Sequence, residues 1–181
     1  MTSVGQDHHA ARPGLVITAV GPDRPGLIFD LSTQISNRGG NIEDTKMSKL
    51  GGMFAVLMLV TGADAALSEL LSERAHLEQL LGISCFLAPT HASTIPVADI
   101  WRFSASGFDR PGIVAVVSEL LAANGVNVTS FLSRIENAPL SGTPLFVLEA
   151  EAVVPPGSSK PLIESNLKAA CEREGLELIS S

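Results

Sequence analysis

The feature that most constrains this chain is a hexapeptide that occurs twice. GPDRPG fills residues 21–26, and GFDRPG fills residues 107–112 of a chain of 181 residues. The match extends beyond the hexapeptide, because Asn41 and Asn127 follow it at the same distance in the two copies. A period of more than 80 residues is too long for a solenoid repeat, which usually spans roughly 20 to 50 residues. The sequence therefore predicts a duplicated small domain.

The repeat divides the chain into two domains, each of ordinary size for a small unit. The second copy is longer. Phe54 of the first copy matches Phe146 of the second, which lies further along the chain than the spacing of the two hexapeptides would place it. The extra residues form an inserted loop at 137–143. We predict a flexible tail at 1–13, a first domain at 14–88, a linker at 89–97 and a second domain at 98–181.

Each copy shows the same order of predicted elements: strand, helix, strand, strand, helix, strand. Short apolar, β-branched runs predict the strands, and leucines at helical spacing predict the helices. This βαββαβ order is the ferredoxin-like arrangement, an α+β fold with an antiparallel sheet covered by helices on one face. The first copy has strands at 15–20, 41–48, 53–60 and 83–87 and helices at 25–37 and 64–81. The second has strands at 101–106, 126–135, 144–153 and 176–179 and helices at 111–124 and 160–174.

Composition argues against several classes of function. The net charge is −7 without a cluster of Lys and Arg, so we expect no direct contact with nucleic acid. The longest apolar run, residues 53–60, is too short to span a bilayer, and the first residues do not resemble a signal peptide. The two cysteines lack CxxC spacing, which argues against a metal or redox site. We expect a cytoplasmic protein without membrane contact.

The repeated hexapeptide offers backbone donors to an anion. It lies between the first strand and the first helix, where the first helical amides lack partners and the helix dipole adds partial positive charge. Glycine also lets a ligand approach the backbone closely. We therefore expect each turn to suit a small carboxylate. The expected donors are the N–H groups of Gly26, Leu27, Gly112 and Ile113.

Asn41 and Asn127 open the second strand of each copy, which we expect to lie close to the first strand. A side-chain amide both donates and accepts, so it could complete a site for the ammonium and carboxylate of a free amino acid. A purely structural role remains open: Asp caps the helix, Pro-Gly forms a tight turn and Asn ends a helix in the left-handed conformation. Arg24 and Arg110 could bind a ligand carboxylate, or pair with the neighbouring Asp or the other domain.

Two long stretches also resemble a known family. They are LVITAVGPDRPGLIFDLSTQISNRGGNIEDTKMSKLGGMFAVLMLV and WRFSASGFDRPGIVAVVSELLAANGVNVTSFLSR. Together they resemble tandem ACT domains, in particular the glycine cleavage system transcriptional repressor group. The resemblance implies regulatory binding of small molecules, usually amino acids, at interfaces between ACT units. The matching positions are Asp23, Arg24, Pro25, Gly26, Leu27 and Asn41, with Asp109, Arg110, Pro111, Gly112, Ile113 and Asn127.

These observations favour a regulatory protein over an enzyme. The two copies account for the chain, and it contains no GxSxG, HExxH, GxxxxGK or GxGxxG motif. We expect no catalytic residues, no metal and no cofactor. We expect an amino acid ligand, indirect action on transcription or metabolism through a protein regulator, and a homodimer. The alternatives are a ligand-free interaction module, or a detached regulatory part related to formyltetrahydrofolate deformylase or phosphoserine phosphatase.

Overall fold

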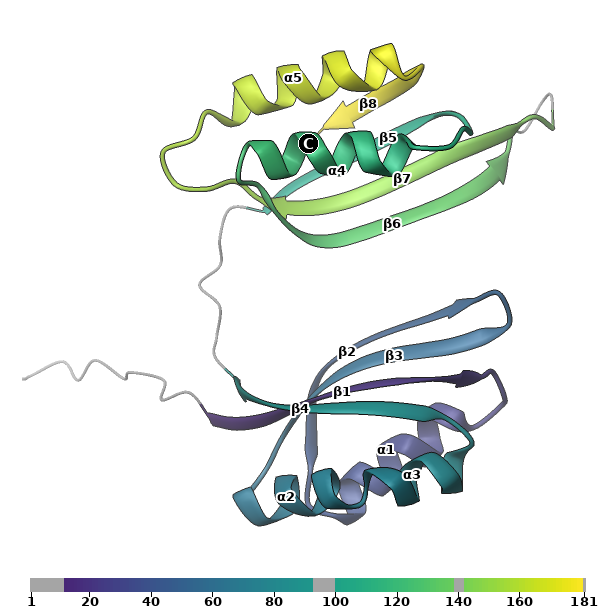
Figure 1. Ribbon diagram of the computed structural model, residues 1–181, viewed down its shortest axis with the longest axis vertical. Coiled ribbons are helices and arrows are strands. Elements are labelled where there is room, and N and C mark those ends of the chain that lie inside the picture. The colour runs from purple at the N-terminus through teal and green to yellow at the C-terminus, as the bar shows by residue number, and fades with distance from the viewer. Residues whose placement is uncertain (1–11, 93–99, 139–141, 181) are drawn as a thin grey trace, which may run out of the picture. The chain divides into compact units, whose positions relative to one another are not determined.

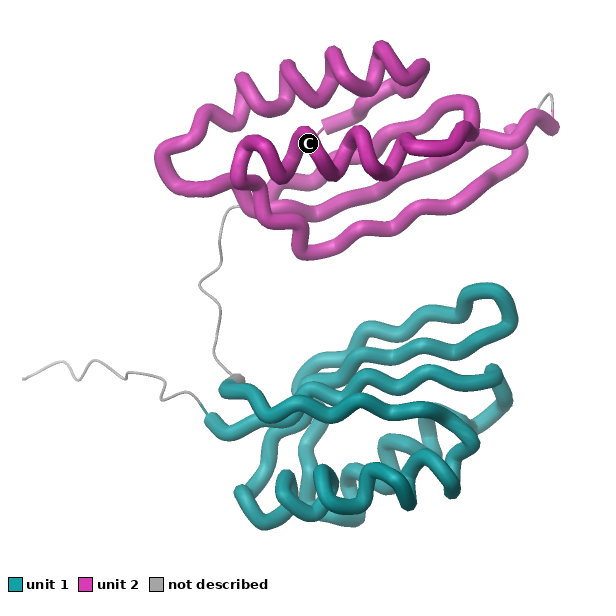
Figure 2. Tube along the Cα trace, in the orientation of Figure 1, with its two compact units in different colours: residues 1–94 teal, residues 95–181 magenta. Residues whose placement is uncertain are grey.

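The central strands in the first half of the chain form at apolar runs, 15–20 and 53–60, whose side chains point alternately to a buried face and to a more exposed face of the sheet. The structure is a computed structural model that describes residues 12–92, 100–138 and 142–180. The chain divides into two units, Met1–Thr94 and Ile95–Ser181 (Figure 2). Unit 1 contains β1 (Arg12–Pro22), α1 (Leu27–Asn37), β2 (Asn41–Leu50), β3 (Met53–Thr61), α2 (Asp64–Ser72), α3 (Arg74–Leu81) and β4 (Ser84–Ala92).

Unit 2 repeats the same succession of elements. It contains β5 (Ile100–Phe108), α4 (Ile113–Ala123), β6 (Asn127–Asn137), β7 (Pro144–Val153), α5 (Lys160–Arg173) and β8 (Leu176–Ser180). The strand orders are β2-β3-β1-β4 and β6-β7-β5-β8, with antiparallel pairing throughout. In each unit the helices cover one face of the sheet (Figure 1). The predicted tandem ferredoxin-like fold is confirmed.

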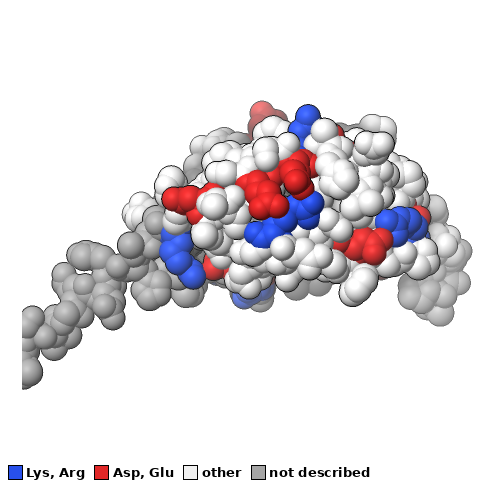
Figure 3. All heavy atoms as spheres, turned by 90° about the horizontal axis from the view of Figure 1, so that it is seen from below, with Lys and Arg blue, Asp and Glu red and all other residues white. Residues whose placement is uncertain are grey.

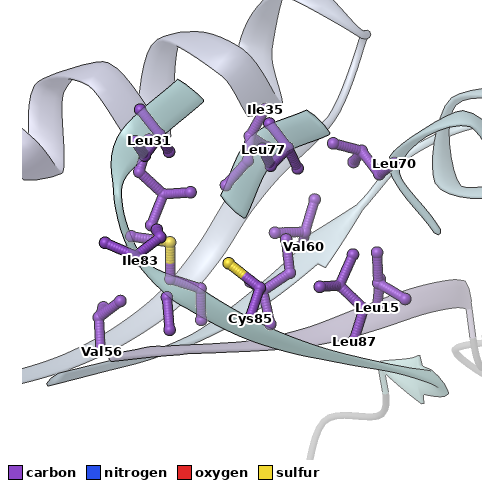
Figure 4. Close-up of a cluster of buried hydrophobic side chains, with 14 of the residues drawn as sticks. Leu15, Leu31, Ile35, Val56, Val60, Leu70, Leu77, Ile83, Cys85 and Leu87 are labelled. Atoms are coloured by element: carbon purple, nitrogen blue, oxygen red, sulfur yellow. The ribbon is translucent and has the colours of Figure 1, made fainter. Parts of the chain in front are cut away.

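The core of each unit lies between its sheet and its helices. In unit 1, helix side chains such as Leu31 and Leu77 face strand side chains such as Leu15 and Val60 (Figure 4). All four of these side chains are fully buried. Unit 2 has its own cluster, centred on Trp101 of β5, Leu148 of β7 and Leu167 of α5. The two clusters share no residue.

Several predicted boundaries differ from the structure. The predicted helix at 64–81 is interrupted at Glu73, whose φ of −92° and ψ of 11° are not helical, and so it forms α2 and α3. Strand β1 begins at Arg12, within the predicted tail, and β4 runs to Ala92, within the predicted linker. Residues 1–11 of the tail, 93–97 of the linker and 139–141 of the inserted loop lie outside the described residues.

Candidate functional site

The repeated Arg-Pro-Gly sequence forms a tight turn before the first helix of each unit. Gly26 has φ 81° and ψ −1°, the values of the third residue of a type II turn, and Pro25 occupies the second position, which favours proline. The N–H of Leu27 donates to the carbonyl of Arg24 at 3.4 Å, which closes this turn. The expectation that the Leu27 N–H is free for a ligand is therefore wrong. Gly112, with φ 96° and ψ −9°, repeats the geometry after Pro111.

The first helix of each unit therefore begins without the Asp cap that the purely structural alternative predicts. Gly26 and Gly112 are the N-cap residues, and neither helix has a side-chain cap. The prediction that an Asp of the hexapeptide caps the helix is wrong. The Oδ2 atom of Asp23 instead lies 2.6 Å from Nζ of Lys49. The backbone N–H of Asp23 donates to the carbonyl of Gly52 at 3.2 Å. Asp23 thus ties the turn to the β2–β3 hairpin.

The first glycine of the hexapeptide has a steric role that the sequence analysis missed. A Cβ atom on Gly21 would lie 2.7 Å from Cγ2 of Ile83. A Cβ atom on Gly107 would collide with the carbonyl oxygen of Gly175. In each unit the chain entering the last strand passes directly against this glycine. Its repetition was a visible signal, but the contact depends on residues more than 60 positions away.

Both arginines of the repeat have acidic partners. Nη1 of Arg24 lies 2.8 Å from Oδ2 of Asp30, on the first turn of α1. Arg110 pairs with Glu174, at the end of α5. All four side chains are partly exposed, and exposed ion pairs contribute at most about 1 kcal/mol. A ligand carboxylate can therefore replace these partners at little cost.

Asn41 and Asn127 lie far from the turn of their own unit. Asn41 is opposite Thr61 on β3, and Thr61 is opposite Gly14 at the beginning of β1, whereas the turn follows the end of β1. Gly14 is therefore level with Asn41, and eight residues of β1, or about 26 Å, separate it from the turn. The expectation that β2 lies close to β1 is wrong, because β3 separates them. Within one unit, no amino acid can touch both the turn and the Asn.

A second alternative for the Asn residues also fails. Among the described residues, only glycines have positive φ, so neither Asn adopts the left-handed conformation. Gly39, with φ 78°, and Gly125, with φ 66°, follow the helices instead. Both Asn side chains are exposed. They are free to meet a ligand or another unit.

A β-bulge lies two residues beyond each Asn, between Ile42 and Asp44 in β2 and between Val128 and Ser130 in β6. In unit 1 the bulged residue, Glu43, accepts a hydrogen bond from the buried Thr61 at 3.0 Å. In unit 2, Thr129 donates to the carbonyl of Glu151 at 3.2 Å. The surroundings of the two Asn residues are thus alike in backbone but different in charge.

Of two hollows on the surface of the described residues, one lies beside the predicted site and the other does not. One hollow of about 260 Å³ lies between α1 and α3, and includes Asp30, the partner of Arg24. Another, of about 330 Å³, lies on the uncovered face of the second sheet, between Arg102 and Ile179. On the face shown in Figure 3, acidic and basic side chains lie next to each other, without an extended patch of one sign.

Two properties of the described residues bear on other kinds of site. Within residues 12–92, 100–138 and 142–180, no three His, Cys, Asp or Glu side chains are grouped closely enough to hold a metal ion. No helix in that part of the chain is sufficiently long and apolar to cross a membrane.

Comparison with known proteins identifies the family. The ACT domain pattern matches residues 14–86, which covers most of unit 1. Over 70 residues, 38% of this chain and 78% of the relative, the chain is 34% identical to the UPF0237 protein MK1213 of Methanopyrus kandleri. The chain belongs to the ACT domain family. With the same fold repeated in unit 2, it is a tandem ACT protein.

Two further relatives span both ACT units. The glycine cleavage system transcriptional repressor of Escherichia coli K12 is 28% identical over 159 residues, which are 87% of this chain and 83% of the relative. A crystal structure of an unknown protein from Galdieria sulphuraria is 27% identical, with a TM-score of 0.74, and the match covers 93% of this chain and 96% of that one. The tandem arrangement is therefore shared with other proteins.

Proposed function

We propose that this tandem ACT protein is a non-enzymatic regulator that binds a free amino acid at an interface between two ACT units. It acts indirectly on transcription or metabolism by presenting a changed surface to a protein regulator. The similarity to a glycine cleavage system transcriptional repressor supports a role in transcription. We also place the protein in the cytoplasm, where its two free cysteines would remain reduced.

The observation that carries this proposal is the separation of the turn from the Asn within each unit. Apart from the Leu27 N–H, which closes the turn, the start of the helix offers backbone amides to a carboxylate. Asn41 or Asn127 offers a side-chain amide that can bind an ammonium group or a carboxylate. About 26 Å of strand lies between them in one unit. A ligand that needs both must lie between two units that are antiparallel, so that the turn of one is level with the Asn of the other.

Arg24 and Arg110 give the proposed site its selectivity for a carboxylate. Each guanidinium already lies at its turn, held by Asp30 or Glu174 in a partly exposed ion pair. An incoming carboxylate offers each guanidinium a partner of the same charge and chemistry. When a ligand carboxylate replaces Asp30 or Glu174, the ion pair between the arginine of the turn and that helical residue is lost. Such an exchange gives a ligand different affinities for two states, which regulation requires.

Isothermal titration calorimetry of the full chain against the twenty amino acids, beginning with glycine and serine, tests this proposal. We expect a Kd in the micromolar to low-millimolar range, or roughly −8 to −4 kcal/mol. Asn41→Ala or Asn127→Ala should weaken binding. Asn166→Ala, on the exposed surface of α5, is the matched control and should leave binding unchanged.

The contrary result is also informative. No heat with any amino acid, for protein shown to be folded by circular dichroism, would refute amino acid binding. It would favour a ligand-free interaction module. In that case the two Asn substitutions would alter association with a protein partner without altering any ligand response.

A further inference from the structure

The uncovered face of the first sheet is apolar at its centre. Directly paired residues on neighbouring strands point to the same face. Two rows of paired residues cross this face, and we call them row A and row B. Row A runs from β2 to β4 through Asp44, Leu59, Val16 and Ala88, and row B through Lys46, Leu57, Thr18 and Phe86.

Row B exposes two large apolar side chains. Phe86 is 67% exposed and Leu57 is 45% exposed, although the core residues beside them in sequence are buried. Contiguous apolar surface of this kind marks an interaction site more often than a solvated surface. The charges in these two rows lie on the β2 edge, at Asp44 and Lys46.

Unit 2 provides an internal control for this surface. The repeat places Arg102 where unit 1 has Val16, and Glu149 and Glu151 where unit 1 has Leu57 and Leu59. These side chains form ion pairs across the face, including Nε of Arg102 with Oε1 of Glu151 at 2.8 Å. The same fold therefore forms with charged residues in the centre of this face. Folding alone does not require the apolar residues of unit 1.

We propose that rows A and B of unit 1 are covered by the same rows of a second copy of this chain. A two-fold axis across the strands, between the two rows, places row A of one copy on row B of the other. Asp44 then faces Lys46 of the second copy, and the reciprocal pair forms as well. The large Phe86 meets the small Ala88, and Leu57 meets Leu59.

This arrangement agrees with the known geometry of stacked sheets. Two sheets pack about 10 Å apart, with their strands rotated by about 30°. The rotation displaces the sheet edges more than the centre, where Leu57 and Leu59 meet. The flexible four-carbon stem of Lys46 can follow that displacement to reach Asp44 of the second copy. The face is thus complementary, in charge and in side-chain size, to the same face of a second copy of the chain.

Sedimentation velocity of the full chain tests the dimer. We expect twice the 18.9 kDa mass of one chain. Leu57→Glu introduces the residue type that unit 2 tolerates at the matching position. It should raise the dimer Kd by about 30-fold or more, because it places a charged side chain against the apolar Leu59 of the second copy. Ile179→Glu, which changes the position in unit 2 that matches Phe86, is the control and should leave the mass unchanged.

Exchange of charges tests the reciprocal ion pairs and does not depend on Leu57→Glu folding. Asp44→Lys alone and Lys46→Asp alone should each weaken the dimer, because like charges then face each other. A mixture of the two singly substituted chains should form a heterodimer, and the double exchange in one chain should restore the homodimer. A monomeric wild-type chain, a Leu57→Glu dimer of unchanged Kd, an equal loss with Ile179→Glu, or failure of the mixture to associate would overturn the proposal.

Discussion

At the scale of single residues, the repeated hexapeptide combines several separate physical requirements. Gly21 and Gly107 leave room for the chain that enters the last strand. The proline and the last glycine set a type II turn. Asp23 and Arg24 form ion pairs with Lys49 and Asp30. The glycines and the proline recur because the same junction of strand and helix recurs.

The left-handed conformation of Gly26 leads to a first prediction. Gly26→Ala should lower the free energy of unfolding of unit 1 by about 1–2 kcal/mol, the cost of holding an ordinary residue at this φ. A Cβ atom there would meet no neighbour within 4 Å, so the loss is conformational and not steric. Urea unfolding measures the change. Gly26→Asn should cost less, because Asn tolerates this region, and equal losses would contradict the explanation.

The buried thiol of Cys85 leads to a second prediction. Burial, with a smaller contribution from Glu78, raises its pKa from 9.0 to about 11, against a lowering by Arg74. In a Cys171→Ala chain, the native thiol should therefore react with Ellman's reagent at pH 8 much more slowly than the unfolded thiol. Stability should also fall as pH rises from 9.0 towards 11, since the unfolded thiol ionises first. Equal native and unfolded rates would contradict burial as the cause.

At the scale of elements, side chains of α3 bind the edge strand β4. Oε1 of Glu78 accepts a hydrogen bond from the N–H of Cys85 at 2.8 Å. Nη1 of Arg74 lies 2.9 Å from the same oxygen and donates to the carbonyl of Cys85 at 3.3 Å. The two side chains thus occupy the backbone groups of Cys85 as a neighbouring strand would. They protect part of this sheet edge against pairing with another chain.

Removal of this clamp leads to a third prediction. Glu78→Ala should lower the free energy of unfolding of unit 1 by about 1–2 kcal/mol, because the Cys85 amide loses a charged acceptor. Hydrogen exchange of that amide should accelerate, which NMR can measure. Glu78→Gln retains an acceptor and should recover part of the loss, whereas Gln79→Ala on the exposed side should have little effect. Unchanged exchange in Glu78→Ala would show that the clamp is unimportant.

The elements also show which features the sequence could predict. Strand β7 has the predicted bounds, because its alternation and flanking turns are local. The interruption at Glu73 was not predicted, since no glycine or proline marks it. There Nε of Arg38, at the end of α1, donates to Oε2 of Glu73 at 2.8 Å, a contact between residues 35 positions apart. The separation of Asn41 from the turn was missed for a related reason: periodicity identifies strands but not their order.

At the scale of the whole molecule, the two buried clusters predict two separately responding units. Leu70 belongs to the first cluster and Leu167 to the second, and both are fully buried. Leu70→Ala should cost about 2–5 kcal/mol, from lost burial and the cavity left behind, and Leu167→Ala should cost a similar amount. Hydrogen exchange followed by mass spectrometry should show lost protection in β1–β4 for Leu70→Ala and in β5–β8 for Leu167→Ala. Joint loss of protection in both units by either variant would mean that the duplicated domains unfold as one, and that a change at one ACT unit reaches the other through stability and not only through a ligand.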